Sequence, residues 1–224
     1  MKKPIPPDLL IQLRSHQQYT ETLGKEGKKL EAEGLDLSEL DLSGRNLSGT
    51  DLQKARFDNT DLRKADLYHA YMDICSFHQA LLDEAMLVKA NFTRSTFTKA
   101  SLRSIRGLKA DFTQADLRYA DLSNADLRRV YFAGANLSEA VLRHAVLTRA
   151  CFNEANLTGA DLTGAHLGGI FLSGVVGIES VKADWIEIGT DEAPERLEGE
   201  AARQWLLDDV LTSPPLWRGD ENDG

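Results

Sequence analysis

The sequence predicts an all-β solenoid, and two periodic features of the chain carry that prediction. From Leu37 to Leu172 a large apolar residue returns at every fifth position, with Gly107 as the one exception among 28 positions. Two residues before each of them lies a second, usually small residue, which is Ala in 18 of the 28 repeats. A period of five fits neither an amphipathic helix nor an alternating strand. It requires a backbone that turns a corner every five residues, with one large and one small side chain pointing inward.

The repeat unit resembles that of a known family. Runs such as Ala120-Asp121-Leu122-Ser123-Asn124 and the similar run over 160–164 follow the pattern A-(D/N)-L-x-x of pentapeptide-repeat proteins, and the resemblance covers residues 35–174. It implies a right-handed quadrilateral β-helix with four repeats in each coil, so that the 28 repeats make about seven coils. At a strand spacing of about 4.8 Å the stack would be roughly 34 Å tall.

The inward positions are sorted in a way that supports this register. Four repeats per coil place residues 20 apart on top of one another, and phenylalanine is then confined to two of the four inward columns. The other two columns hold only leucine and Gly107. Offset stacking of aromatic rings favours such sorting. We expect Ile105, which replaces the usual alanine, to offset the missing side chain at Gly107.

The segment before the repeats, residues 1–34, is expected to cap the first coil, because an open solenoid end exposes backbone groups and core side chains. A helix is predicted over 8–22, with Asp8 as its N-cap and Gly24 after its end. The leucines expected to lie over the first coil are Leu9, Leu10 and Leu13.

The segment after the repeats, residues 175–211, is expected to form the opposite cap. It consists of a predicted strand over 181–188 and a predicted helix over 194–211, with Leu197, Ala201 and Trp205 on one stripe. This strand-plus-helix unit would cover Leu172, and the family resemblance leaves open a homodimer contact through the same helix. Residues 212–224, with two prolines and several acidic residues, predict a disordered tail.

Charge and composition limit the class of protein. The net charge of −9 arises after the repeats, since residues 175–224 carry 4 basic and 13 acidic side chains, whereas residues 35–174 carry 16 and 17. The chain contains no apolar run near 18 residues and no signal-peptide pattern after Lys2 and Lys3. Two cysteines are too few for a disulfide framework. These features predict a cytoplasmic protein with reduced thiols.

Catalytic and metal-binding patterns are missing from the sequence. In the register of the repeats Cys75 points inward and Cys151 outward, three coils apart, which excludes a disulfide between them. A quadrilateral β-helix is filled by side chains and has flat faces, whereas enzymes need a concave site. The sequence therefore predicts a protein that is not an enzyme and that has no small-molecule substrate, cofactor or metal. The histidines fall on different faces or coils and are expected on the solvated surface: His16, His69, His78, His144 and His166.

One of the four faces differs from the others in charge. The faces around the columns of Leu37, Leu42 and Leu52 each sum to −2, whereas the face around the column of Leu47 sums to +5 and also exposes apolar side chains. Such a face is either simply solvated or an interface, and the mixture of arginine with apolar residues is typical of interface cores. The residues predicted to bind a protein partner are Lys89, Arg106, Leu108, Lys109, Arg128, Arg129, Val146 and Arg149.

The family resemblance supplies an alternative function, because members of this family mimic DNA and protect DNA gyrase and related topoisomerases from poisons. Duplex DNA carries one charge per about 1.7 Å, so a mimic about 34 Å tall needs roughly 20 negative charges. Residues 35–174 sum to −1, which disfavours this function. Direct nucleic-acid binding by the +5 face is also disfavoured, because apart from Tyr68 the face lacks interleaved aromatic side chains.

Overall fold

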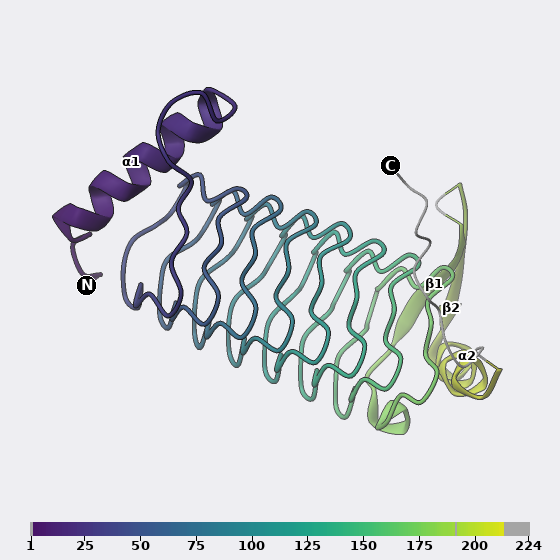
Figure 1. Cartoon of the computed structure of the whole chain (residues 1–224). Helices are drawn as coiled ribbons and strands as arrows, with labels where there is room; N and C mark the ends of the chain where they lie inside the picture. Colours follow the sequence, from purple (N-terminus) through teal and green to yellow (C-terminus); the bar gives the residue numbers. More distant parts are fainter. Residues whose placement is uncertain (1, 191, 213–224) are drawn as a thin grey trace.

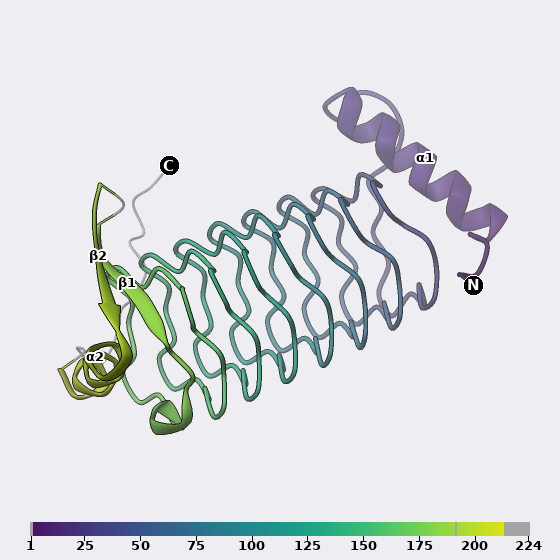
Figure 2. The ribbon, with the colours of Figure 1, turned by 180° about the vertical axis from the view of Figure 1, so that it is seen from behind.

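The computed structural model describes residues 2–190 and 192–212 of the 224-residue chain. Its elements are α1 (Pro7–Glu21), η1 (Ile178–Ser180), β1 (Trp185–Thr190), β2 (Ala193–Glu198) and α2 (Gly199–Thr212). Figure 1 shows α1 at one end of an elongated stack of coils and β1, β2 and α2 at the other, and Figure 2 shows the same arrangement from behind. The expected disordered tail lies outside the described residues apart from Thr212, which ends α2.

Parallel bridges between backbones build the stack. Each bridge joins one residue of a repeat to the residue 20 positions later, from Glu31 and Asp51 to Asn156 and Val176. The spacing of 20 residues means that four repeats complete one turn, as the sequence predicts. The first bridge begins at Glu31, one repeat earlier than the sequence pattern, so the lead-in already joins the stack.

The corners of the coil share one backbone conformation. Counting the small inward residue as the first of each repeat, the fifth residue has a positive φ, between 53° and 76°, in all 28 repeats. Glycine holds seven of these positions and residues with side chains hold the rest. A hydrogen bond closes most of these turns, as where the Ala125 N–H donates to the Leu122 carbonyl at 3.2 Å. Because the conformation repeats, side chains at the fifth position of stacked repeats leave the backbone in the same direction.

The second and fourth positions of the repeat are joined by local hydrogen bonds. The Asp121 carboxylate accepts bonds from the backbone N–H of Ser123 at 3.0 Å and from its hydroxyl at 2.5 Å. Where arginine replaces serine, as at Arg128, its guanidinium donates to Asp126. The frequent sequence of Asp or Asn followed two residues later by Ser, Thr or Arg is therefore turn chemistry, in which a short polar side chain caps nearby N–H groups.

The interior consists of two columns of stacked phenylalanines beside columns of leucine. Phe57, Phe77 and Phe97 stack with centroids 4.7 and 4.5 Å apart and an interplanar angle of 4°. They meet the second column edge to face, since Phe92 and Phe97 lie 5.3 Å apart at 85°. The sorting of aromatic residues that the sequence predicts thus corresponds to continuous ring contact inside the stack.

The gap at Gly107 is filled by its neighbours. A Cβ atom placed on Gly107 would lie 2.9 Å from Cδ2 of Leu127 in the next coil and 3.7 Å from Cδ1 of Ile105. Both side chains are buried, with exposures of 0% and 1%. Two residues therefore share the compensation, and Leu127 lies closer than Ile105, the residue that the sequence suggested.

Replacing Ile105 with alanine should destabilise the stack by about 2–5 kcal/mol, because it removes buried methyl groups beside a position that has no side chain to move inward. Urea unfolding measures the change. Ala125→Gly is the matched control one coil further along the same column, and it should cost about 1 kcal/mol. Equal losses for the two variants would show that Ile105 does not fill the gap.

The N-terminal helix packs on the first coil through Leu9 and Leu13, which are buried, while Leu10 is only half-buried. The prediction of Asp8 as N-cap is wrong. The helix starts at Pro7, the residue favoured at the first helical position, so Asp8 lies within the first turn. There the carboxylate stabilises the positive end of the helix dipole without capping a backbone N–H.

His16 lies inside this interface, so its prediction as a solvated residue is wrong. Its side chain is 0% exposed, and Nδ1 accepts a hydrogen bond from the Leu30 N–H at 3.1 Å. Nε2 has no hydrogen-bond partner among the described residues. Burial lowers the pKa of His16, the backbone of Ser48 partly opposes this shift, and the nearby charge of Lys29 adds to the lowering. Protonation of Nδ1 would place its N–H opposite the Leu30 N–H, so that two donors would face each other without an acceptor. The docked helix therefore requires the neutral ring.

Docking of α1 should weaken as the pH falls below about 6.5, the ordinary pKa of histidine. A released helix takes up a proton that the docked helix cannot hold, so docking loses stability until the pH reaches the lowered pKa of His16. The methyl NMR signals of Leu9 and Leu13 report this change. His16→Gln keeps an acceptor for Leu30 without a titration in this range, and an identical pH response in that variant would contradict the account.

At the other end the structure contains a β-hairpin where the sequence predicted the start of a helix. Residues 194–198 belong to β2 and pair antiparallel with β1, with Ile186 opposite Leu197. Helix α2 begins only at Gly199 and buries Ala202 and Leu206, so the predicted stripe is wrong by one residue. Strand pairing and burial of Ile186 against the stack outweigh the helical pattern of this short segment.

The hairpin continues the stack beyond the last repeat. Lys182 bridges to Asp161 and Glu187 bridges to His166, in the same parallel sense as the coils. The predicted strand over 181–188 corresponds to β1 at 185–190 with a preceding bridge at Lys182. Residues after the repeats therefore cover two sides of the last coil with backbone pairing before the chain turns into β2.

Candidate interaction surface on the basic face

The face around the Leu47 column, here called the basic face, comprises residues 45–49 and the equivalent segments at intervals of 20 up to 165–169. Three columns of side chains point outward from it. The second-position column includes Met86, Arg106, Asp126, Val146 and His166. The fourth-position column includes Tyr68, Val88, Leu108, Arg128, Thr148 and Gly168. The fifth-position column includes His69, Lys89, Lys109, Arg129, Arg149 and Gly169.

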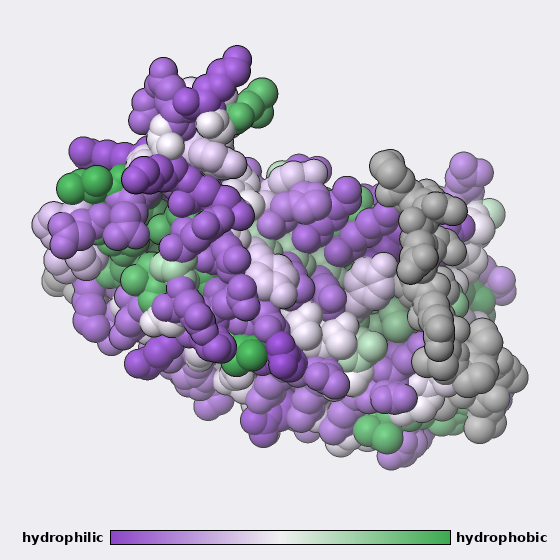
Figure 3. All heavy atoms as spheres, in the orientation of Figure 1, coloured by the Kyte–Doolittle hydropathy of each residue, from purple (hydrophilic) through white to green (hydrophobic). Residues whose placement is uncertain are grey.

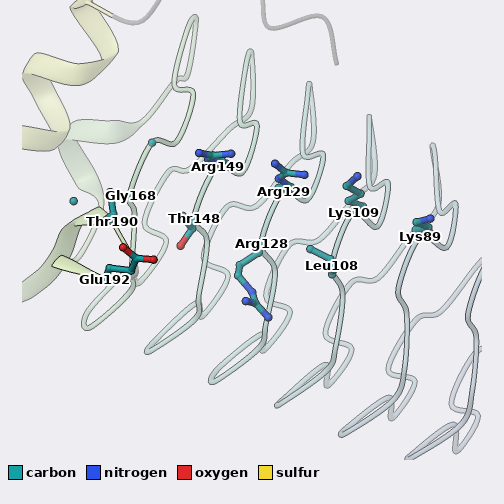
Figure 4. Close-up of a pocket in the computed structure, with 12 residues that line it drawn as sticks. Lys89, Leu108, Lys109, Arg128, Arg129, Thr148, Arg149, Gly168, Thr190 and Glu192 are labelled. Carbon is teal, nitrogen blue, oxygen red and sulfur yellow. The ribbon is translucent and has the colours of Figure 1, made fainter. Parts of the chain in front are cut away.

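Four consecutive members of the fifth-position column are cations, and the backbone fixes their spacing. The N–H of Lys89 donates to the Leu108 carbonyl at 3.0 Å, and that of Arg149 donates to the Gly168 carbonyl at 2.9 Å. With a spacing of about 4.8 Å per coil, Lys89, Lys109, Arg129 and Arg149 span roughly 14 Å. Figure 4 shows the four side chains in a row, each from the same corner of successive coils.

A hollow of about 820 Å³ lies over this part of the face. Six of the eight residues predicted from the sequence line it. Arg106 and Val146 lie on the same face in the second-position column and do not line the hollow. The six lining residues are Lys89, Leu108, Lys109, Arg128, Arg129 and Arg149.

The expectation of a flat face is wrong here because the C-terminal hairpin rises beside the last coils. Gly189, Thr190 and Glu192 form one wall of the hollow, while Gly168 and Gly169 leave space at its foot. A Cβ atom on Gly168 would lie 1.9 Å from the Gly189 carbonyl oxygen, so the hairpin can lie here only because position 168 has no side chain. The Gly168-Gly169 pair was the only signal of this feature in the sequence.

The positive charge of this face is less compensated than that of the others. On the neighbouring faces arginines form close ion pairs, such as Arg63 with Asp61 and Arg118 with Asp116. Within the described part of the chain, Lys89, Arg106 and Arg149 take part in no ion pair. A face with an excess of positive charge attracts acidic surfaces at long range.

Arg128 is the exception, because its guanidinium binds both oxygens of Asp126, at 2.8 and 2.6 Å. This hydrogen bond lowers the pKa of Asp126, against the effect of burial, and the charge of Arg106 contributes. Asp126 therefore stays ionised and holds Arg128 in place on the face.

Apolar side chains occupy the end of the face nearer α1. Tyr68 is 44% exposed, and Met86, Val88 and Leu108 are half-buried. Elsewhere the visible surface is mainly hydrophilic, with apolar side chains in small groups (Figure 3). The fourth-position column therefore changes from apolar side chains, near α1, to Arg128 and Thr148, nearer the hairpin, while the fifth-position cations run beside both parts.

The described residues form neither a metal-binding group nor a reactive thiol. In this part of the chain no three His, Cys, Asp or Glu side chains are grouped so that they could hold a metal ion. Cys75 is buried and its thiol donates to the Leu52 carbonyl at 3.0 Å, and burial raises its pKa to about 12. Cys151 stands at an outward position, but it is buried and burial raises its pKa too. Neither thiol is set up to react.

Comparison with known sequences identifies the repeat. A family model of pentapeptide repeats matches residues 36–73, 75–105, 108–132, 125–164 and 155–180, which is more than half of the chain. The chain belongs to the pentapeptide-repeat family. Proteins of this family fold as right-handed quadrilateral β-helices, so the predicted fold class is confirmed. A search of curated proteins gives no match.

Solved pentapeptide-repeat proteins share the fold. A trypsin-treated variant of QnrB1, a plasmid-mediated fluoroquinolone resistance protein, is 22% identical, with a TM-score of 0.54, over 69% of this chain and 77% of its own. HetL of the cyanobacterium Nostoc, involved in heterocyst differentiation regulation, is 24% identical over 80% and 97%, with a TM-score of 0.29. Rfr23 of the cyanobacterium Cyanothece is 22% identical over 76% and 99%, with a TM-score of 0.35. The likeness to QnrB1, at 22% identity, concerns the fold alone.

Membrane insertion has no support in the helices. None of those in the described part of the chain combines the length and apolar content that crossing a bilayer requires.

Replacing Gly168 with alanine should displace the hairpin from the foot of the hollow, because its methyl group would collide with the Gly189 carbonyl. We expect a loss of about 1–3 kcal/mol and faster proteolysis between β1 and β2. Gly49→Asn is the matched control. Its corner is open, and Asn59 and Asn124 already occupy equivalent corners. Unchanged proteolysis in the Gly168 variant would contradict the close contact.

Proposed function

We propose that this protein is a non-enzymatic cytoplasmic scaffold that binds a protein partner through the basic face. One observation carries the proposal: a column of four cations at fixed spacing runs through a hollow, beside apolar side chains that are only partly buried. Interfaces combine desolvated apolar groups and arginine at their centre. The solvated-face alternative explains neither the hollow nor the apolar side chains beside the cations.

Rigidity of the stack is part of the proposed function. We propose that the 28 repeats over 35–174 form about seven coils, with residues 1–34 capping one end and residues 175–211 the other. Backbone bridges on every side of the coil fix the backbone position of each cation relative to the next. Little backbone conformational entropy is therefore lost when a partner binds. The contribution of the caps is to keep the terminal coils from pairing with other chains.

The charge pattern suggests an acidic surface on the partner. Long-range attraction by the basic face would raise the association rate, and salt would lower it. The apolar side chains near α1 would then be desolvated and slow dissociation. No small molecule or membrane is part of this function.

The alternative of a DNA mimic that protects a topoisomerase receives less support. A mimic needs a continuous negative surface, but on the other faces many aspartates are neutralised by neighbouring arginines. The close pairs among the described residues include Asp61 with Arg63, Asp73 with Arg94, Asp83 with Arg103 and Asp161 with Arg143. The likeness to QnrB1 at 22% identity supports the shared fold and adds nothing on the partner.

Reversing Lys89, Lys109 and Arg149 to glutamate should abolish capture of the partner from native lysate and leave the fold intact. Glu39, Glu84 and Glu139 already occupy the same corner with positive φ, so the backbone tolerates this residue. Quantitative mass spectrometry after cross-linking measures capture, and sedimentation of the same samples tests whether α2 also forms a homodimer contact.

The matched control reverses Lys54, Lys64 and Lys99, which hold the same corner on the other faces. It makes the same change in net charge, and the ion pairs that it breaks are exposed and contribute little. Capture should survive in this control. Capture that survives the basic-face reversal, or that is lost equally in both variants, would overturn the proposal.

A further inference from the structure

We propose that the part of the partner bound in the hollow is an acidic α-helix that lies along the solenoid axis. This inference rests on the proposed function and specifies the chemistry of the partner. It starts from the spacing of the cations, the shape of the hollow and the order of apolar and basic residues along it.

The spacing of the cations matches the pitch of an α-helix. Successive coils place one cation about every 4.8 Å along the axis, and an α-helix brings one side chain of a face back about every 5.4 Å. Over the four cations the two periods diverge by roughly 2 Å. Lysine and arginine side chains bridge such a difference, because they are long and flexible.

An extended peptide fits this spacing poorly. Its side chains return to the same face every two residues, about 6.6–6.8 Å apart, so four cations would meet at most three of them. The mismatch reaches almost half a coil at each step. The fixed spacing of this face therefore discriminates between a helix and a strand that carry the same charges.

The shape of the hollow suits a helix aligned with the stack. Leu108, Arg128 and Thr148 line it from the fourth-position column, and the four cations line it from the fifth. Both columns run parallel to the axis, as the view in Figure 4 shows for the labelled side chains. At one end the hairpin wall, including Thr190 and Glu192, limits how far a helix can extend.

The order of side chains along the face predicts which end of the partner helix is apolar and which end is acidic. Tyr68, Val88 and Leu108 follow one another in the fourth-position column, and Arg128 continues it toward the hairpin. The helix should therefore carry apolar residues at the end nearer α1 and glutamate or aspartate at the end nearer the hairpin. Such a partner satisfies the charge of Lys89 and Arg149, for which the described residues form no ion pair.

Three peptide probes of equal net charge and a short DNA duplex test this inference with the full-length protein. The first is a helical peptide, held by a side-chain cross-link, with three glutamates one turn apart on one face, followed by two leucines on the same face. The second has the same composition and cross-link, but its glutamates are spread around the helix. The third keeps the order of the first with prolines that prevent a helix, and the fourth is a short DNA duplex. Fluorescence polarisation at low and physiological salt measures binding.

The aligned helix should bind at least about tenfold more tightly than each of the other probes. Reversal of Lys109 and Arg149 to glutamate should remove that advantage, and reversal of Lys54 and Lys64 should keep it. Equal binding of both helical peptides would overturn the inference by showing attraction to charge alone. Tighter binding of the proline peptide or of DNA would overturn it in favour of a strand or of nucleic acid.

The two proposals fail separately. If no probe binds but capture of the native partner still depends on Lys89, Lys109 and Arg149, the helix inference is wrong and the proposed function stands. If capture does not depend on these residues, the proposed function is wrong as well.

Discussion

Backbone hydrogen bonding between coils is the constraint on which the rest of this structure depends. Every side of the coil is short, so each repeat pairs through only a few N–H and carbonyl groups with the repeats above and below. Pairing over so short a length works only if every corner turns through the same angle. The positive φ of the fifth residue, present even at Lys89 and Arg149, is the local conformation that allows this. Its cost is offset by the pairing and the buried interior that it makes available.

Side-chain chemistry follows from this backbone. Inward positions must fill a channel of constant width, so leucine, phenylalanine and alanine recur, and Gly107 is accommodated by Leu127 and Ile105. Outward positions are free of this demand, and their composition can serve binding. Because the corner directs each fifth side chain alike, four cations on successive coils leave the backbone at fixed positions in one column. A loop on an ordinary domain would have to lose conformational entropy to present the same arrangement.

The sequence predicts the repetitive part of this molecule well and its ends poorly. The inward columns could be predicted from the five-residue period because every repeat must meet the same packing requirement. The stacking of Phe57, Phe77 and Phe97 could be predicted because phenylalanines recur 20 residues apart. The ends lack that redundancy. Residues 194–198 resemble a helix but pair with β1. His16 looks solvated but is buried on the side of α1 that packs against the stack. Both outcomes depend on contacts that no period encodes.

The candidate site was predictable in part, because it is formed by the repeats and by the C-terminal hairpin. Its basic and apolar columns could be predicted from the register, and six of eight predicted residues line the hollow. The hollow itself could not be predicted from the register, because it arises from the packing of the hairpin against Gly168.

Site-specific photo-cross-linking tests most directly whether this face binds the partner. A photoreactive residue at Val88 samples the basic face, and one at Thr98 samples the same fourth position on another face. The account predicts one cross-linked adduct of defined mass from position 88 in cells and none from position 98. An adduct from position 98 with none from position 88 would contradict it.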